Sequence, residues 1–159
     1  MAIRTGDTAA PFELPHAVGQ TANLAESFGS EPVVLLFFPL AFSPTCTDEM
    51  CTMRDDWNKW TEVGAKVYGI TVDSPFITDK FRQDLDIPFP ILSDFNTDVS
   101  RTWGACYDEF HGMRNVPKRA AFVVAANGTV AYDWVSEDAA ALPDFDAIRA
   151  AVQGTTANT

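Results

Sequence analysis

The chain has 159 residues, of which 47% are apolar and 21% charged, so it fits one globular domain with a sizeable core rather than a disordered segment. Its formal net charge of −11 repels phosphate backbones and anionic membrane surfaces, and we expect neither nucleic acid nor membrane as a partner. The longest apolar run, residues 32–42, is too short to span a bilayer. The first residues lack the apolar core of a secretory signal, and we therefore expect a cytoplasmic location.

The apolar pattern of the first half of the chain predicts a βαβ unit. Residues 32–38 form a continuous β-branched and aromatic run, typical of a strand buried on both faces, and residues 66–72 form another. The segment between them, from about 44 to 63, contains several helix formers and no strand alternation. A strand, a helix and a strand at this spacing indicate a parallel sheet. The Ser-Pro pair that follows opens a predicted helix at about 75–85.

The second half continues this pattern. Its predicted elements are, in chain order, a strand at 89–92, a helix at 97–105, strands at 120–124 and 129–135, and a helix at 144–152. Pro90 indicates the sheet edge or the start of a strand, and Asn127-Gly128 is typical of a type I′ hairpin turn. The sequence therefore predicts an α/β fold, with a mixed sheet flanked by helices on both faces. We expect one domain over residues 1–153 and a loose tail over 154–159.

Three cysteines, Cys46, Cys51 and Cys106, are an odd number, which argues against a structural disulfide framework and favours redox or catalytic use. The two histidines, His16 and His111, are distant from the cysteines in sequence, so no zinc-ligand spacing is present. We therefore expect no metal and no cofactor.

Cys46 is the candidate nucleophile because it directly follows the first buried strand. Ser43 and Pro44 are typical of a helix N-cap and first helical residue, which places Cys46 at about the third helical position. There, unpaired backbone N–H groups and the positive end of the helix dipole favour a thiolate, which is the nucleophilic form. A cysteine at a helix start, taken alone, is equally compatible with a small packed apolar residue.

The surroundings of Cys46 favour the catalytic interpretation. Pro39, Ser43 and Cys46 stand in the spacing Pro-x-x-x-Ser-x-x-Cys, after a buried strand and at the start of a helix. This arrangement resembles the active-site signature of the peroxiredoxins, in which threonine or serine occupies the middle position. The resemblance covers nearly the whole chain. It implies a thioredoxin-like fold and a thiol-dependent peroxidase that reduces hydrogen peroxide or organic hydroperoxides in antioxidant defence.

The resemblance implies a role for each matching residue. Cys46 matches the peroxidatic cysteine, which the peroxide oxidises to a sulfenic acid. Ser43 matches the hydroxyl that orients the peroxide, and Pro39 matches the proline that shields the thiolate from water. Glu49 matches an acidic residue often found three positions after the cysteine, with first-turn helix stabilisation as an equal alternative. Arg119 matches the arginine that stabilises the thiolate.

Arg119 is also conspicuous without the resemblance. A basic residue that enters a buried apolar strand is hard to explain unless it meets an anion. Its guanidinium offers several fixed donors for a thiolate and a peroxide at once. The neighbouring Lys118 faces the opposite side of an extended chain and is expected at the surface.

The sequence allows three routes for reducing the sulfenic acid. Cys51 lies five positions after Cys46, which is similar to the peroxiredoxin Q (bacterioferritin comigratory protein) branch, where a disulfide forms within the helix. In an intact helix such residues lie roughly 7.5 Å apart along the axis and about 140° around it. Because a disulfide needs Cα atoms within about 7 Å, the helix must unwind locally. Cys106 is the other candidate within the chain. A one-cysteine cycle with an external thiol, as in the alkyl hydroperoxide reductase E branch, is the third route.

The resemblance also implies a thioredoxin- or glutaredoxin-like reductant and, because family members often pair around the active site, a homodimer.

Two other functions compete with the peroxidase. A thioredoxin-like disulfide oxidoreductase would carry Cys-x-x-Cys at the helix start, where this chain has Ser43 and Glu49 around the cysteine. A non-catalytic redox-sensing or binding module would not need Ser43, Cys46 and Arg119 together.

Several aromatic residues have structural interpretations. Trp57 and Trp60 lie three apart on one helix face and are expected to anchor the core or an interface. Phe42 and Trp103 are candidates for the peroxide entrance or a dimer contact. His111, between Phe110 and a glycine, is expected in a loop.

Overall fold

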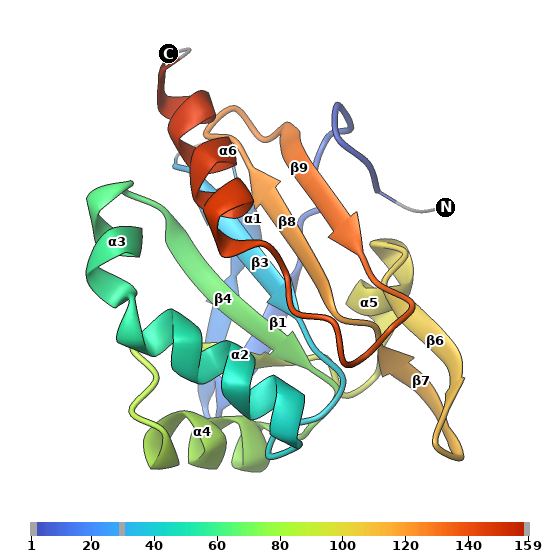
Figure 1. Cartoon of the computed structure of the whole chain (residues 1–159). Helices are drawn as coiled ribbons and strands as arrows, with labels where there is room; N and C mark the ends of the chain where they lie inside the picture. Colours follow the sequence, from blue (N-terminus) through green and yellow to red (C-terminus); the bar gives the residue numbers. More distant parts are fainter. Residues whose placement is uncertain (1–2, 29–30, 158–159) are drawn as a thin grey trace.

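A five-stranded mixed sheet with the strand order β5-β4-β3-β8-β9 forms the centre of the fold (Figure 1). The computed structural model describes residues 3–28 and 31–157. The strands of the sheet are β3 (Val33–Phe37), β4 (Lys66–Thr71), β5 (Ile91–Ser93), β8 (Ala120–Val124) and β9 (Val130–Val135). β3, β4 and β5 run parallel, whereas β8 runs antiparallel to both β3 and β9.

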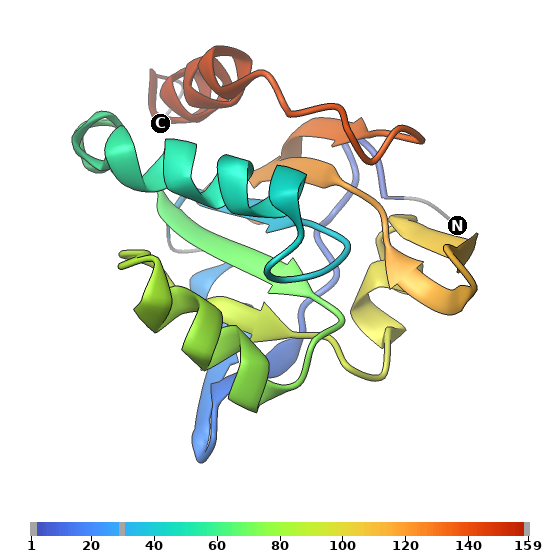
Figure 2. The same ribbon diagram turned by 60° about the horizontal axis from the view of Figure 1, so that its bottom comes forward.

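Helices cover both faces of this sheet. The helices are α1 (Leu24–Ser27), α2 (Pro44–Asp55), α3 (Trp57–Glu62), α4 (Pro75–Asp84), α5 (Asp98–Thr102) and α6 (Phe145–Ala157). In Figure 1, α2 and α6 lie in front of the sheet, and α1 and α5 lie behind it. Figure 2 shows the same layers from another side, with α2 (teal) and α6 (red) above the strands. The arrangement confirms the predicted α/β fold.

The fully buried strand β3 organises the core, because successive side chains of a strand point to opposite faces. Val34 and Leu36 pack in a cluster that includes Met50 of α2 and Ile148 of α6. The alternate residues of β3 pack on the other face in a cluster that includes Trp103. Helix α2 is thereby held against the sheet, so the start of α2 has a defined position at the end of β3.

Two predicted helices are shorter than expected. The segment 44–63 is divided at Asp56, whose backbone (φ −101°, ψ 19°) leaves the helical conformation between α2 and α3. Helix α5 ends at Thr102, before Gly104, whose φ of 75° is the left-handed conformation that commonly terminates helices.

Trp103 is fully buried against core aromatics, so its assignment to the peroxide entrance or a dimer contact is wrong.

Two antiparallel hairpins and α1 were not predicted. The hairpins are β1–β2 (Glu13–Ala17 and Gln20–Asn23) and β6–β7 (Cys106–Phe110 and Met113–Pro117). Their residues are mostly half-buried or exposed and lack the apolar runs that identify the central strands. Figure 1 shows β6–β7 projecting beside the sheet.

The predicted turn at Asn127-Gly128 has a different geometry. A type I′ turn requires positive φ at both central residues, but of these two only Gly128 has one, at 87°. Strand β8 ends at Val124 as predicted, and β9 begins at Val130, one residue later than predicted, so the connection between them is longer than a two-residue turn. His111 and Gly112 at the tip of β6–β7 both adopt positive φ, 50° and 81°, as the tight turn of that hairpin requires.

The carboxy-terminal helix is longer than the sequence indicates. Helix α6 extends to Ala157, so residues 154–157, predicted as part of a loose tail, are helical. Residues 158–159 of that predicted tail lie outside the described residues. None of the helices in the described segments combines the length and apolar character needed to cross a membrane.

Candidate active site

Cys46 lies in the first turn of α2, at the carboxyl end of β3. Ser43 is the N-cap residue with extended backbone, and Pro44 follows at the first helical position, as predicted. The Thr47 backbone N–H donates to the Ser43 carbonyl at 2.9 Å, which closes the first helical turn. The Cys46 side chain is buried, with 1% of its surface exposed. Its sulfur therefore lies at the helix end that favours negative charge.

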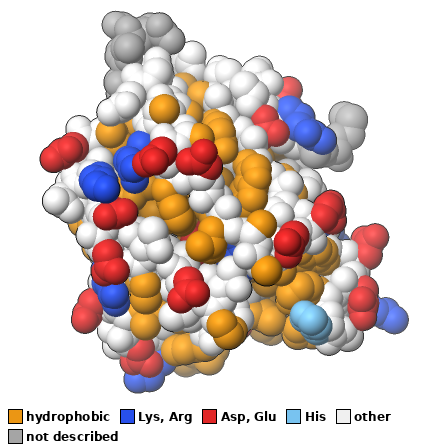
Figure 3. All heavy atoms as spheres, viewed as in Figure 1, with side chains coloured by type: hydrophobic (Ala, Val, Ile, Leu, Met, Phe, Trp, Pro, Cys, Tyr) orange, Lys and Arg blue, Asp and Glu red, His pale blue; other side chains and the backbone are white. Residues whose placement is uncertain are grey.

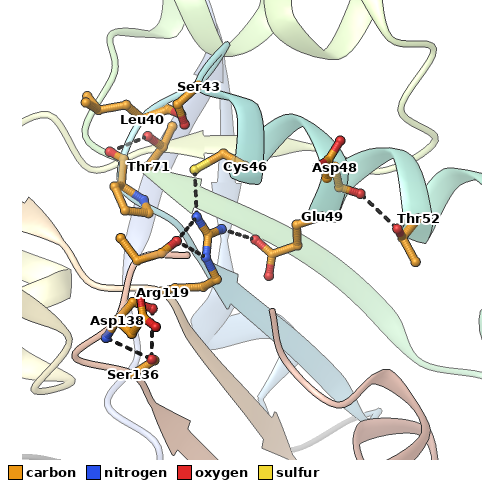
Figure 4. A network of polar contacts seen from close by, with 12 residues as sticks. Leu40, Ser43, Cys46, Asp48, Glu49, Thr52, Thr71, Arg119, Ser136 and Asp138 are labelled. Carbon is orange, nitrogen blue, oxygen red and sulfur yellow. Dashed lines mark hydrogen bonds and ion pairs between the residues drawn. The ribbon is translucent and has the colours of Figure 1, made fainter. Parts of the chain in front are cut away.

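Arg119 reaches this sulfur from the neighbouring strand. It directly precedes β8, in which Ala120 pairs with Phe37 of β3, so the register brings Arg119 beside the β3–α2 connection. The guanidinium donates from Nη2 to the Cys46 sulfur at 3.2 Å, and Arg119 is 1% exposed (Figure 4). The structure thus brings the two predicted residues into contact in the interior.

Glu49 is the second acidic partner of this guanidinium. It is fully buried one turn after Cys46, and its Oε1 accepts from Arg119 Nη1 at 2.8 Å. Burial raises the pKa of Glu49 to about 7, although the charge and hydrogen bond of Arg119 lower it. Its Oε2 is buried without a hydrogen-bond partner among the described residues, which adds to the cost of ionising the carboxyl. Glu49 therefore belongs to the buried site rather than to a solvated first turn.

Two acidic side chains also act on Arg119. Burial opposes its positive charge, but Glu49 and Cys46 outweigh burial and raise the pKa of Arg119. The guanidinium consequently stays charged and holds two acidic groups from the same helix face.

A third contact to Arg119 comes from the backbone. The Ala139 carbonyl, in the connection between β9 and α6, accepts from Arg119 Nε at 3.1 Å and from Nη2 at 2.9 Å. All three nitrogens of the guanidinium are thereby engaged. Sequence reasoning missed Ala139 because a backbone carbonyl has no residue-specific signature.

A cavity of about 430 Å³ opens in front of the sulfur. The lining residues come from four segments of the chain: Pro39, Leu40, Ser43, Pro44, Thr45 and Cys46; Phe110 and His111; Arg119; and Asp138, Ala139 and Ala140. Four of them are predicted site residues, whereas the hairpin and the 138–140 segment were not anticipated. Figure 3 shows apolar side chains gathered between the start of α2 and the β6–β7 hairpin.

Ser43 faces this cavity without capping the helix. Its Oγ donates to the Leu40 carbonyl at 2.8 Å, and no side-chain cap bond forms to α2. Because the proton is used in that bond, the lone pairs of the oxygen remain to accept from a peroxide O–H. Phe42, the other candidate for the entrance, is 50% exposed and packs against Phe81 rather than lining the cavity.

The loop that contains Pro39 is tied to the end of β4. Thr71 Oγ1 lies 3.2 Å from the Pro39 carbonyl and 2.8 Å from Asp73 Oδ2. That carboxylate oxygen also accepts from the Ala41 backbone N–H at 2.6 Å. The wall of the cavity beside Cys46 is therefore fixed by Thr71 at the end of β4 and by Asp73 just after it.

The other two cysteines lie away from this contact network. All three cysteines are free thiols, and Cys51 and Cys106 are half-buried. Helix α2 is continuous from 44 to 55, so a Cys46–Cys51 disulfide requires it to unwind. Cys106 begins β6 rather than ending a helix, and burial raises the pKa of its thiol. In the described part of the chain, these thiols join no group of three or more metal-ligating side chains.

Comparisons with known proteins agree with this geometry. A model of the AhpC/TSA family matches residues 5–133. The chain is 34% identical over 128 residues to a chloroplastic peroxiredoxin Q of Sedum lineare, covering 80% of this chain and 67% of that protein. It is 35% identical over 130 residues to a putative peroxiredoxin of Mycobacterium tuberculosis, covering 80% and 82%. Against the peroxiredoxin Q of Gentiana triflora it spans 57% of the relative's length.

A solved structure shows the same architecture. The crystal structure of the peroxidoxin BcpB from Mycobacterium tuberculosis superposes with a TM-score of 0.83 and 33% identity, covering 96% of this chain and 97% of that one. The sequence signature, the cysteine–arginine contact and these matches identify the chain as a member of the AhpC/TSA family, a peroxiredoxin with a thioredoxin-like fold.

Proposed function

We propose that this peroxiredoxin-family chain is a thiol-dependent peroxidase in which the Cys46 thiolate reduces hydrogen peroxide or organic hydroperoxides. The observation that carries the proposal is the Arg119 guanidinium, bonded at once to the Cys46 sulfur and to Glu49 beside an open cavity. The guanidinium places fixed hydrogen-bond donors and positive charge beside the sulfur, where negative charge moves during attack on a peroxide. That cavity gives a small oxidant access to the sulfur.

The chemistry at this site is a displacement at peroxide oxygen. The thiolate sulfur of Cys46 attacks one peroxide oxygen, so that an S–O bond forms while the O–O bond breaks. The leaving oxygen departs with the bonding electron pair and takes up a proton, which gives water or an alcohol. The cysteine is oxidised to a sulfenic acid. Arg119 donors stabilise the negative charge that moves onto the oxygens, and Ser43 accepts from the peroxide hydroxyl.

The cavity supports organic hydroperoxides as substrates beside hydrogen peroxide. Pro39, Leu40, Pro44 and Phe110 supply an apolar wall, and the volume of about 430 Å³ exceeds what a molecule the size of hydrogen peroxide occupies. The apolar wall can therefore contact an organic group while the peroxide end meets Ser43 and Arg119.

Completion of the cycle requires a reductant. A thiol attacks the sulfenic sulfur, a disulfide forms, and water leaves. Cys51 in α2 is the candidate within the chain, and an external thiol is the alternative. We propose a thioredoxin- or glutaredoxin-like protein as the final reductant and the cytoplasm as the site of action, since three cysteines are an odd number that argues against a structural disulfide framework. We also propose a homodimer, which the resemblance to the peroxiredoxins implies.

The alternative of a thioredoxin-like disulfide oxidoreductase is not favoured. Such an enzyme needs a second cysteine three positions after the first, at the helix start. In this chain that position is occupied by Glu49, which is buried and accepts a hydrogen bond from Arg119. A non-catalytic binding module would not need the buried Arg119 guanidinium in contact with the Cys46 sulfur.

The proposal is tested by peroxide consumption with dithiothreitol as the reductant. Cys46→Ser is expected to abolish consumption of hydrogen peroxide, and Cys106→Ser, which changes a half-buried thiol outside the cavity, serves as the matched control. Full activity in Cys46→Ser would refute the assignment.

A further inference from the structure

The connection between β9 and α6 holds the catalytic guanidinium in place. Residues 136–140, here called the arginine loop, present the Ala139 carbonyl to both Nε and Nη2 of Arg119, at 3.1 and 2.9 Å. The same Nη2 donates to the Cys46 sulfur at 3.2 Å. A change in the position of this carbonyl therefore moves the donor that reaches the sulfur.

Asp138 fixes the backbone on both sides of Ala139. Its Oδ1 accepts from the Ala140 N–H at 2.9 Å, and its own N–H donates to Ser136 Oγ at 3.0 Å. The Ser136 hydroxyl in turn donates to the Asp138 carbonyl at 2.9 Å (Figure 4). The Ala139 carbonyl and the Ala140 N–H belong to one peptide group, so the Asp138 carboxylate holds the same peptide group that binds Arg119.

Further contacts tie the arginine loop to its surroundings. The Ser136 N–H donates to the Arg119 carbonyl at 2.9 Å, so the loop binds both the backbone and the side chain of this arginine. The Tyr107 hydroxyl lies 3.1 Å from the Glu137 carbonyl, and Lys118 Nζ pairs with the Glu137 carboxylate at 2.6 Å. These contacts anchor the amino-terminal end of the loop at Ser136 and Glu137, whereas Asp138 sets the internal turn that aims the carbonyl.

We propose that Asp138 is a positioning residue for peroxide reduction, acting through the Ala139 carbonyl on the Arg119 guanidinium. Asp138 is exposed and does not belong to either core cluster, so core packing does not account for the hydrogen bond that its carboxylate accepts from the Ala140 N–H. This inference rests on the proposed peroxidase function, because it concerns the geometry of the same sulfur.

The test compares three variants with the wild type in the rate of Cys46 oxidation by hydrogen peroxide. Asp138→Ala removes the acceptor for the Ala140 N–H and is expected to slow the reaction about threefold to tenfold, the range for one lost hydrogen bond. Asp138→Asn keeps an oxygen acceptor and removes the charge, so it is expected to react at the wild-type rate. Asp144→Ala is the matched control, since Asp144 is also exposed and accepts one backbone N–H, that of Ala147 at 3.1 Å.

A second measurement reports the position of the guanidinium without activity. In ¹⁵N NMR, the Arg119 Nε proton is expected to exchange with solvent faster in Asp138→Ala than in Asp138→Asn or Asp144→Ala, because its acceptor is no longer held. The inference would be overturned if Asp138→Ala matched the wild type in both the rate of Cys46 oxidation and the exchange of the Arg119 Nε proton. It would also be overturned if Asp138→Asn slowed Cys46 oxidation as much as Asp138→Ala does. A wild-type protein that does not react with peroxide would instead refute the peroxidase function.

Discussion

The guanidinium of Arg119 donates to the sulfur of Cys46 at 3.2 Å, although 73 positions separate the two residues in the chain. The contact exists because Arg119 precedes the strand that pairs antiparallel with β3, while Cys46 follows β3 itself. The same guanidinium holds Glu49 and the Ala139 carbonyl. Four groups from three separate segments therefore depend on one another for their positions.

Substitution of Arg119 by lysine is expected to slow the oxidation of Cys46 by about 10- to 100-fold, the range for loss of a hydrogen bond to a charged group. A single ammonium cannot reproduce the fork that engages Cys46, Glu49 and Ala139 together. Stopped-flow measurement of the oxidation rate checks this. Arg82→Lys, at a half-exposed arginine of α4 that pairs with Asp79, is the control and should leave the rate unchanged. Equal rates in the two variants would contradict a role for the guanidinium.

The raised pKa of Glu49 makes stability depend on pH. Between its ordinary value of 4.5 and about 7, the carboxyl is protonated in the folded chain and ionised in the unfolded one, so the folded state binds the extra proton. The free energy of unfolding therefore falls as the pH rises through this window, by up to about 1.4 kcal/mol per pH unit, and levels off above it. In Glu49→Gln this contribution is absent. Urea titrations of both proteins at several pH values measure the difference, and parallel curves for the two would contradict the assignment.

Oxidation of Cys51 is expected to require unwinding of α2. If Cys51 resolves the sulfenic acid, intact-mass analysis after one equivalent of hydrogen peroxide shows a loss of about two mass units in the wild type and in Cys106→Ser, but not in Cys51→Ser. Backbone amides of α2 then lose their protection from hydrogen exchange in the oxidised protein. A gain of one oxygen in all three proteins would indicate instead a one-cysteine cycle with an external thiol.

Phe110 is expected to matter more for large peroxides than for small ones. It lines the cavity from the tip of β6–β7, where its ring can contact an organic group that hydrogen peroxide lacks. Phe110→Ala should therefore slow the reaction with cumene hydroperoxide about threefold to tenfold and leave that with hydrogen peroxide nearly unchanged. Phe95→Ala, at an exposed phenylalanine outside this cavity, is the control. An equal effect of Phe110→Ala on both peroxides would contradict this role.

Most of the site residues that the sequence predicts lie in one short segment of the chain. The segment from Pro39 to Cys46 combines the end of a buried strand with an N-cap serine and a first-turn proline, and these local signals place Cys46 at the helix start without any tertiary information. Arg119 is visible for a different reason, because a charge beside a fully buried apolar strand requires an anionic partner. The sheet and its two helical layers are likewise predicted by apolar runs.

The residues that only the tertiary structure reveals lie in segments without such signals. The hairpin that carries Phe110 and His111 has no apolar alternation, so neither its strands nor its position over the cavity can be inferred from sequence. Ala139 acts through its carbonyl, a group that every residue possesses, and Asp138 through a turn within an exposed connection. Sequence signals alone predict the candidate nucleophile and place it at the start of a helix, because these signals depend on neighbouring residues. The tertiary structure decided what surrounds the sulfur, because long-range strand pairing and loop packing bring those groups together.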